Sequence, residues 1–380
     1  MLDKFELIAI ISTISFTISL LIVVLLIPPI NKLGFKYNII DIPNQRKKHN
    51  SIIVRLGGLG IFWGFILGLL ITYKIIDLLG IITIDYGPIY LIITGSICFF
   101  LIGLTDDIFS LSPFLRLISQ VLISSFLYVN GIKFEAIDLS WISPNLHYLF
   151  IPQFLSFAMV TIWIVGLTNA INWLDGLDGL ASGVCLISCV GLFVIFLSLG
   201  RIDLVFVCST FCGAIIGFLR YNFFPAKILM GDGGSYLLGS TLSILAIVGL
   251  SYNFNFENLI VDESLNVVKV FPINIAILVF FIPIIDMVLV ILTRIYHGNS
   301  PFYPDRSHIH HKILNMGLND RGTVIIIYAL SQLFVCMAVY LSGVPFKIFY
   351  ICVSIILMSL SFLYCLNMQV HLNSQNRKEL

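Results

Sequence analysis

The chain has very few charged residues. Of its 380 residues, 11% are Asp, Glu, Lys or Arg, 59% are hydrophobic, and the mean hydropathy is +1.03. A soluble domain carries about 25% charged residues, so this composition excludes a soluble protein and predicts an integral membrane protein. The chain also lacks the alternating segments of a transmembrane β-barrel, and its long continuous apolar runs favour helices.

Two further features are absent. The lead-in MLDKFE is not basic and no A-x-A-like site follows the first apolar run, so we expect a membrane span there rather than a secretory signal. No pair of the eight cysteines forms a C-x-x-C motif, and all eight fall within apolar runs. We therefore expect small buried hydrophobic side chains rather than disulfides or thiolate metal ligands.

The apolar runs predict the fold class. A spanning helix needs about 20 mostly apolar residues. Eleven stretches meet this requirement, at 7–30, 57–74, 89–104, 114–130, 149–168, 181–200, 202–219, 236–252, 272–293, 323–343 and 346–366. The third is short, and a very tight turn joins the sixth to the seventh. We predict an all-α, polytopic transmembrane protein of about eleven helices, with residues 1–380 forming a single integral-membrane domain.

The basic residues predict an orientation. With eleven spans the loops alternate, and 15 of the 21 Lys and Arg residues then fall on one side and 6 on the other. Basic residues concentrate in cytoplasmic loops. We therefore expect the N-terminus outside and the C-terminus inside.

Five polar clusters interrupt the apolar sequence, and all five fall on the predicted inner side. They are DIPNQRKKHNSIIVRLGG, GLTDDIFSLSPFLR, NAINWLDGLDGLASG, LRYNFFPAKILMGDGGS and RIYHGNSPFYPDRSHIHHKILNMG. The predicted outer loops show no comparable density of polar residues. This one-sided distribution favours one shared site on the cytoplasmic face.

The side chains in these clusters indicate what the site binds. The oxygen-bearing ones are Asp106, Asp107, Asn169, Asn172, Asp175, Asp178 and Asp232. Such oxygens suit Mg²⁺, which usually takes one or two protein carboxylates together with phosphates. Arg and Lys suit phosphate oxygens, and glycines let backbone N–H groups approach an anion. The clusters therefore predict Mg²⁺ and a phosphorylated ligand at the membrane surface.

Simpler interpretations exist for the acidic clusters. Asp106 and Asp107 could cap a helix end, although adjacent aspartates repel and need a cation or a proton to share. The Asp-Gly pairs at Asp175 and Asp178 are ordinary turn formers, but turn chemistry does not explain the asparagines upstream. MGDGGS by itself is a weak signal, because it lacks the Lys-Ser/Thr of a P-loop.

The histidine-rich loop and one buried carboxylate also have alternatives. HIHH could hold zinc, but no cysteine is near and a remote ligand would be needed. We favour phosphate or sugar binding by these histidines together with Arg306. Asp286 lies inside a predicted span, where a functional or paired role is the default, and Arg294, two turns further on, is a candidate partner.

The motifs in their order resemble a known family. DIPN, GLTDD, NAINWLDGLDGLASG, MGDGGS and SPFYPDRSHIHH, spread over residues from about 30 to 320, resemble the polyprenyl-phosphate N-acetylhexosamine-1-phosphate transferases. The combination of acidic motifs is specific, and PDRSHIHH is similar to the branch that uses UDP-N-acetylglucosamine (UDP-GlcNAc).

The resemblance implies a reaction. A lipid phosphate, undecaprenyl phosphate, attacks the β-phosphate of UDP-GlcNAc, and the products are undecaprenyl-diphospho-GlcNAc and UMP. Mg²⁺ is the implied cofactor, with Mn²⁺ as a substitute. The implied location is the bacterial inner membrane, which the chain crosses several times in contact with membrane lipid. No nucleic acid partner is implied, and a homodimer stays open.

The resemblance also implies residue roles. Asp232 would bind Mg²⁺, helped by Asn172. Asp106 and Asp107 would orient or deprotonate the lipid phosphate, while Asp175 and Asp178 would lie against the nucleotide or its metal. His308 completes the implied catalytic set. The implied substrate-binding residues are Lys48, Arg116, Asn169, Arg306, His310 and His311.

Several alternatives remain at this point. The same reaction could use another UDP-N-acetylhexosamine, such as a 6-deoxy sugar, and a covalent aspartyl intermediate could form. Outside enzymes, a secondary transporter would need internal repeats and buried charges in several spans, and a scaffold protein would not need five polar clusters on one face.

Overall fold

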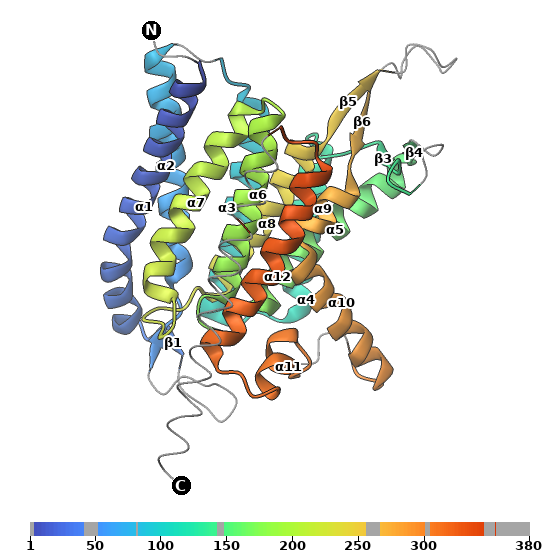
Figure 1. Cartoon of the computed structure of the whole chain (residues 1–380). Helices are drawn as coiled ribbons and strands as arrows, with labels where there is room; N and C mark the ends of the chain where they lie inside the picture. The colour runs from blue at the N-terminus through green and yellow to red at the C-terminus, as the bar shows by residue number, and fades with distance from the viewer. Residues whose placement is uncertain are drawn as a thin grey trace.

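The computed structural model describes residues 4–41, 52–80, 83–142, 148–255, 267–300 and 305–345, and residue 354. In these ranges the chain is a helical bundle with short strands at its ends (Figure 1). The N-terminus and strands β3 to β6 lie toward one end of the bundle, and β1 and α11 lie at the other (Figure 1). The polar clusters lie at the end that carries β1 and α11, as shown below.

Eight helices within the described residues are long and apolar enough to cross a membrane. They are α1 (Lys4–Lys36), α2 (Gly57–Leu79), α3 (Tyr86–Phe109), α5 (Gln153–Leu174), α6 (Leu180–Ser198), α7 (Ile202–Asn222), α8 (Gly231–Leu250) and α12 (Asp320–Leu341). The prediction of a polytopic, mostly helical membrane protein is therefore confirmed. A shorter apolar helix, α4 (Pro113–Val129), corresponds to the fourth predicted span.

The number of eleven spans stays a prediction. The last predicted span, 346–366, lies outside the described residues except for residue 354. The ninth, 272–293, was expected to be one helix and is instead a bent pair, α9 (Ile273–Val279) and α10 (Phe281–Tyr296), which meet at 85°. The bent pair brings the possible total among the described helices to nine.

Pro283 explains the bend. Proline has no N–H and its ring clashes with the carbonyl four residues earlier, which here belongs to Val279. The freed Val279 oxygen instead accepts a hydrogen bond from Ser188 Oγ of α6 at 2.9 Å. A neighbouring helix therefore satisfies the backbone group that the bend exposes, as apolar surroundings require.

The protein is not purely helical, contrary to the all-α prediction. Strands β3 (Ala136–Asp138), β4 (Tyr148–Phe150), β5 (Tyr252–Asn255) and β6 (Val267–Phe271) form one sheet in the order β4-β3-β6-β5. The strands come from the α4–α5 and α8–α9 connections, and β3 pairs with β6 in parallel. Pairing between the strands satisfies the backbone N–H and C=O groups of these two long connections. Long apolar runs predict only spanning helices, so they gave no indication of these strands.

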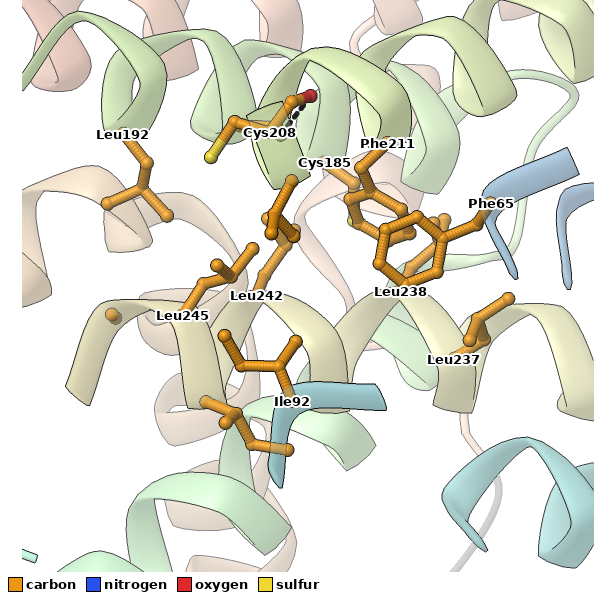
Figure 2. Close-up of a cluster of buried hydrophobic side chains, with 14 of the residues drawn as sticks. Phe65, Ile92, Cys185, Leu192, Cys208, Phe211, Leu237, Leu238, Leu242 and Leu245 are labelled. Carbon is orange, nitrogen blue, oxygen red and sulfur yellow. Dashed lines mark hydrogen bonds between the residues drawn. The ribbon is translucent and has the colours of Figure 1, made fainter. Parts of the chain in front are cut away.

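The core of the bundle is built around α8. Leu237, Leu238, Leu242 and Leu245 of this helix face side chains from α2, α3, α6 and α7 (Figure 2). Cys185 and Cys208 lie among these apolar side chains (Figure 2), which confirms the interpretation of these cysteines as buried hydrophobic residues. A hydroxyl pair, Ser96 Oγ and Thr241 Oγ1 at 2.7 Å, adds a polar link between α3 and α8.

Helix directions bring the polar clusters together. Helices α3 and α5 end, and α2, α4, α6 and α8 begin, at the same end of the bundle, which we call the site end. The strand pair β1 (Ile40–Asp41) and β2 (Ile53–Val54) and the short helix α11 (Ile309–Asn315) lie there too (Figure 1). The expected convergence of the motifs on one end of the molecule is confirmed.

Candidate active site

Asp107 caps the first turn of α8. Its Oδ1 accepts a hydrogen bond from the Asp232 backbone N–H and its Oδ2 accepts one from the Gly233 N–H, both at 2.9 Å. Gly231, with φ of 72°, allows the chain to enter the helix at this angle, a conformation that favours glycine. Capping was one interpretation of this carboxylate from the sequence, but the helix it caps is distant in the chain.

Asp106 has different partners. Its Oδ2 lies 2.6 Å from Arg116 Nη1 of α4, and its Oδ1 accepts a hydrogen bond from the Leu111 N–H at 2.8 Å. The two adjacent aspartates therefore turn to separate partners, Asp106 to Arg116 and Asp107 to the backbone of α8. Asp106 stabilises the α3–α4 turn and places Arg116 at the site end.

Asn172 and Asp232 are in direct contact. Asn172 Nδ2, in the last turn of α5, donates to Asp232 Oδ1 at 2.6 Å and to Ser235 Oγ at 2.9 Å. The Asp232 side chain is 22% exposed, whereas the Asp107 side chain is only 2% exposed. Asp232 is therefore the more accessible of these two carboxylates, next to an amide whose oxygen can also face a ligand.

Arg55 belongs to this group, although the sequence analysis did not include it among the site residues. Its Nη2 lies 3.6 Å from Asp107 Oδ1 and 3.9 Å from Asp232 Oδ2. Strand β2 holds it there, because the Leu229 N–H donates to the Val54 oxygen at 2.8 Å. The signal available in the sequence was its place two residues before the Gly57-Gly58 pair that opens α2.

The Asn-x-x-Asn-x-x-Asp pattern divides at the end of α5. Asn169 and Asn172 lie within the helix, whereas Asp175 occupies its C-cap and Asp178 follows in the turn. Asn169 Nδ2 donates to Gln120 Oε1 of α4 at 2.6 Å, and Gln120 is a second residue the sequence analysis missed. Asp178 Oδ2 accepts from the Ala226 N–H at 2.8 Å and so secures the α7–α8 connection.

The site end carries an excess of negative charge. Burial and the nearby charge of Asp232 raise the pKa of Asp175 to about 7, although Arg55 opposes this shift. A divalent cation would relieve this repulsion and keep Asp175 ionised. Within the described ranges, no group of three or more His, Cys, Asp or Glu side chains forms a metal cluster. The single carboxylate and amide of Asp232 and Asn172 fit Mg²⁺, which needs few protein ligands when phosphates supply the others.

The histidine-rich loop packs against the end of α5. His308 Nδ1 lies 2.7 Å from Asp286 Oδ2, so the suggested pairing of Asp286 with Arg294 is wrong. Arg294 instead binds Asp305 at 2.9 Å and lies over the Trp173 ring at 5.0 Å. Burial alone would raise the pKa of Asp305, but hydrogen bonds from Arg294 and Ser307 and the positive charge of Arg294 outweigh it and lower this pKa to about 2.

The other predicted residues of this loop differ in position. His310 is buried, and its ring lies so close to Gly176 that a side chain there would overlap it. His311 lies beside it, with ring centroids 4.3 Å apart. Arg306 is exposed at the surface. Lys48 lies outside the described residues.

Comparisons with known proteins identify relatives of this chain. The family model described as glycosyl transferase family 4 matches residues 89–250. The probable undecaprenyl-phosphate N-acetylglucosaminyl 1-phosphate transferase of Bacillus subtilis is 32% identical over 330 residues, covering 87% of this chain and 85% of its own. The undecaprenyl-phosphate alpha-N-acetylglucosaminyl 1-phosphate transferase of Escherichia coli K12 is 28% identical over 312 residues, with coverages of 81% and 78%.

A third relative has a different lipid in its name. The decaprenyl-phosphate N-acetylglucosaminephosphotransferase of Mycobacterium tuberculosis is 28% identical over 312 residues, covering 79% of this chain and 75% of its own. With the helical bundle and its polar site end, these matches define a multi-pass membrane enzyme that is a phosphotransferase. The chain belongs to the polyprenyl-phosphate N-acetylhexosamine-1-phosphate transferase family.

Proposed function

We propose that this protein transfers GlcNAc-1-phosphate from UDP-GlcNAc to undecaprenyl phosphate. The products are undecaprenyl-diphospho-GlcNAc and UMP, and the lipid-linked sugar starts a cell-surface glycan. The observation that carries the proposal is the contact of Asn172, Asp232, Asp107 and Arg55, which come from four separate segments. The names of the relatives support the donor sugar and the polyprenyl acceptor.

Charge neutralisation and positioning are the main tasks in such a transfer. In the proposal, Asp232 and Asn172 hold Mg²⁺, which neutralises charge on the diphosphate of the nucleotide sugar. Asp175 lies at the end of α5 beside this pair and contributes to the same negative environment. Arg55, between Asp107 and Asp232, limits the repulsion among these carboxylates.

The aspartate pair is assigned to positioning. Asp107 already accepts two backbone N–H groups of α8 and so determines where Asp232 sits. Asp106 holds Arg116, which is available to orient the acceptor phosphate. The acceptor phosphate is mostly ionised near neutral pH, so neither aspartate has to remove a proton from it.

The test of the reaction is a panel of UDP-sugars. Purified protein in detergent with undecaprenyl phosphate and Mg²⁺ is expected to release UMP and form a lipid-linked product with UDP-GlcNAc. Product formation only with a 6-deoxy UDP-N-acetylhexosamine would assign the donor to that sugar. Absence of UMP release with every sugar in the panel would reject the transferase proposal.

We also propose an orientation in the bacterial inner membrane, with the site end cytoplasmic, the N-terminus outside and the C-terminus inside. The support is the concentration of Lys and Arg in the loops assigned to that side, 15 against 6.

Cysteines introduced at Ser110 and Asn299, on a background without reactive native cysteines, test this orientation. Both positions lie in loops at the site end. They are expected to resist an impermeant thiol reagent in intact cells and to react after the membrane is opened. Labelling of both positions from outside would overturn the orientation.

The loop before α11 is proposed to select the sugar. Arg306 is exposed at the site end, and His308 and His310 pack against the end of α5. Arg306→Ala is expected to lower kcat/KM for UDP-GlcNAc about 10- to 100-fold, the effect of losing one charged hydrogen bond. The apparent KM for lipid phosphate should change little. If Arg306 instead contacts lipid headgroups, the variant will show altered lipid dependence and a normal response to UDP-GlcNAc.

A further inference from the structure

A buried carboxylate on α10 holds the first histidine of the HIHH motif. Asp286 is 1% exposed, and it lies three residues after Pro283, in the part of the ninth span that follows the bend. Its Oδ2 lies 2.7 Å from His308 Nδ1, and its Oδ1 accepts a hydrogen bond from the Ile309 N–H at 2.6 Å. Both oxygens of Asp286 therefore hold the start of α11.

This arrangement determines which ring nitrogen of His308 carries a hydrogen. An ionised carboxylate can only accept hydrogen bonds, so Nδ1 of His308 must donate to Asp286. Among the described residues, no hydrogen bond to Nε2 is present, so this atom remains available to a ligand.

The His308 ring packs against the end of α5, the helix that also carries Asn172. Its centroid is 6.3 Å from that of Trp173, in an edge-to-face arrangement, and Trp173 directly follows Asn172 in α5. Asn172 faces Asp232 of α8, whereas Trp173 faces His308 and Arg294. The end of α5 therefore carries one of the proposed metal ligands, Asn172, and at the next position the ring against which His308 packs.

We propose that Asp286 is a positioning residue that fixes the orientation of the His308 ring, with Nδ1 toward the carboxylate, so that Nε2 is left to contact the nucleotide sugar. The inference rests on the proposed function, because it takes the nucleotide sugar as the ligand. Asp286 itself does not touch the substrate. It acts through His308, and the Ile309 contact prevents the carboxylate from rotating away.

Replacement by asparagine separates the charge of Asp286 from its shape. The Ile309 N–H needs an acceptor, so the new amide oxygen turns to it and the amide NH₂ faces His308 Nδ1. Nδ1 must then accept a hydrogen bond and cannot carry its own hydrogen. The hydrogen of His308 is then on Nε2, so the arrangement of donor and acceptor that Asp286 imposes on the ring is lost.

The test is a double-mutant cycle with Asp286→Asn and His308→Gln. Asp286→Asn is expected to lower kcat/KM for UDP-GlcNAc about 10- to 100-fold, with the apparent KM for undecaprenyl phosphate unchanged. In the His308→Gln background, Asp286→Asn should cause almost no further loss. Equal losses in both backgrounds would show that Asp286 does not act through His308 and would overturn the proposal.

A spectroscopic measurement tests the same point without turnover. In protein labelled with ¹⁵N-histidine, the signal of His308 is identified by its absence in His308→Gln. We expect Nδ1 of His308 to be protonated in the wild type and unprotonated in Asp286→Asn. A wild-type ring protonated at Nε2 alone would contradict the inference.

The two proposals can fail separately. If the wild type makes no lipid-linked product from any UDP-sugar, the proposed function fails, while the protonation of His308 can still be measured. If the wild type turns over normally and the double-mutant cycle shows no coupling, only the role of Asp286 fails.

Discussion

Asp232→Asn is expected to reduce turnover at least ~10³-fold, as for the loss of a principal electrostatic contact in a transferase site, while the protein stays folded and inserted in the membrane. Of the two carboxylates in contact with Arg55, Asp232 is the more exposed. The substitution removes the negative charge that would hold Mg²⁺ against the diphosphate.

Folding should survive this change for a structural reason. Asp107 binds the backbone N–H groups of residues 232 and 233 rather than the Asp232 side chain. An asparagine oxygen at the same position can still accept the hydrogen bond from Asn172 Nδ2. The local structure of the α8 N-terminus is therefore retained without the charge.

The measurement is the initial rate of UMP release over a range of Mg²⁺ concentrations, with melting temperature as the folding control. Asp203→Asn is a matched control, because Asp203 is also a carboxylate in the first turn of a helix and is paired with Arg201 at 3.0 Å. It is expected to retain normal activity. Near-normal activity of Asp232→Asn would remove Asp232 from the site.

The second large effect is expected from Gly103→Ala. Gly103 lies in α3, one turn before Asp107, where the backbone of α8 comes very close. A methyl group added there would lie 2.3 Å from the Asp232 backbone oxygen and 2.6 Å from the Gly233 nitrogen. Backbone atoms cannot move away as a flexible side chain can, so the first turn of α8 must shift.

Such a shift should affect both stability and activity. Overpacking of this kind typically costs about 1–3 kcal/mol, and a misplacement of about 1 Å near reacting groups can reduce the rate about 100-fold. We therefore expect Gly103→Ala to lower the melting temperature and to reduce turnover about 100-fold. The variant replaces none of the proposed site residues, so any loss of turnover comes from their displacement.

Gly166→Ala provides the matched control. Gly166 is also a helical glycine, in α5, but an added methyl group there would approach only Met287 Cε, at an ordinary 3.7 Å. We expect this variant to keep normal stability and activity. If Gly103→Ala behaves like Gly166→Ala, the close approach of α3 and α8 does not determine the position of Asp232.

Much of the site could be predicted from the sequence because membrane spans alternate in direction. The motifs GLTDD, NAINWLDGLDGLASG and MGDGGS follow or precede apolar runs whose order places them at one end of a bundle. The structure brings Asp106, Asp107, Asn172 and Asp232 to that end. This part of the prediction needed only the positions of the apolar runs.

Individual partners were harder to predict. The sequence made Arg294 a candidate partner of Asp286, because the two lie on one helix. The structure instead pairs Asp286 with His308 and Arg294 with Asp305. The break between α9 and α10 had a local signal in Pro283, but the Ser188 hydroxyl that stabilises it comes from α6. Each of these contacts joins elements that are distant in the chain.

The sequence by itself determined that this is a multi-pass helical membrane protein and that its oxygen-bearing and basic motifs gather at one end. Those properties follow from composition and from the spacing of apolar runs, which are local in the chain. Only the tertiary structure decided that Asp107 caps α8, that Arg55 joins Asp107 and Asp232, and that Asp286 holds His308. Such contacts depend on how each helix is rotated and packed against its neighbours, and many alternative pairings are compatible with the same apolar pattern.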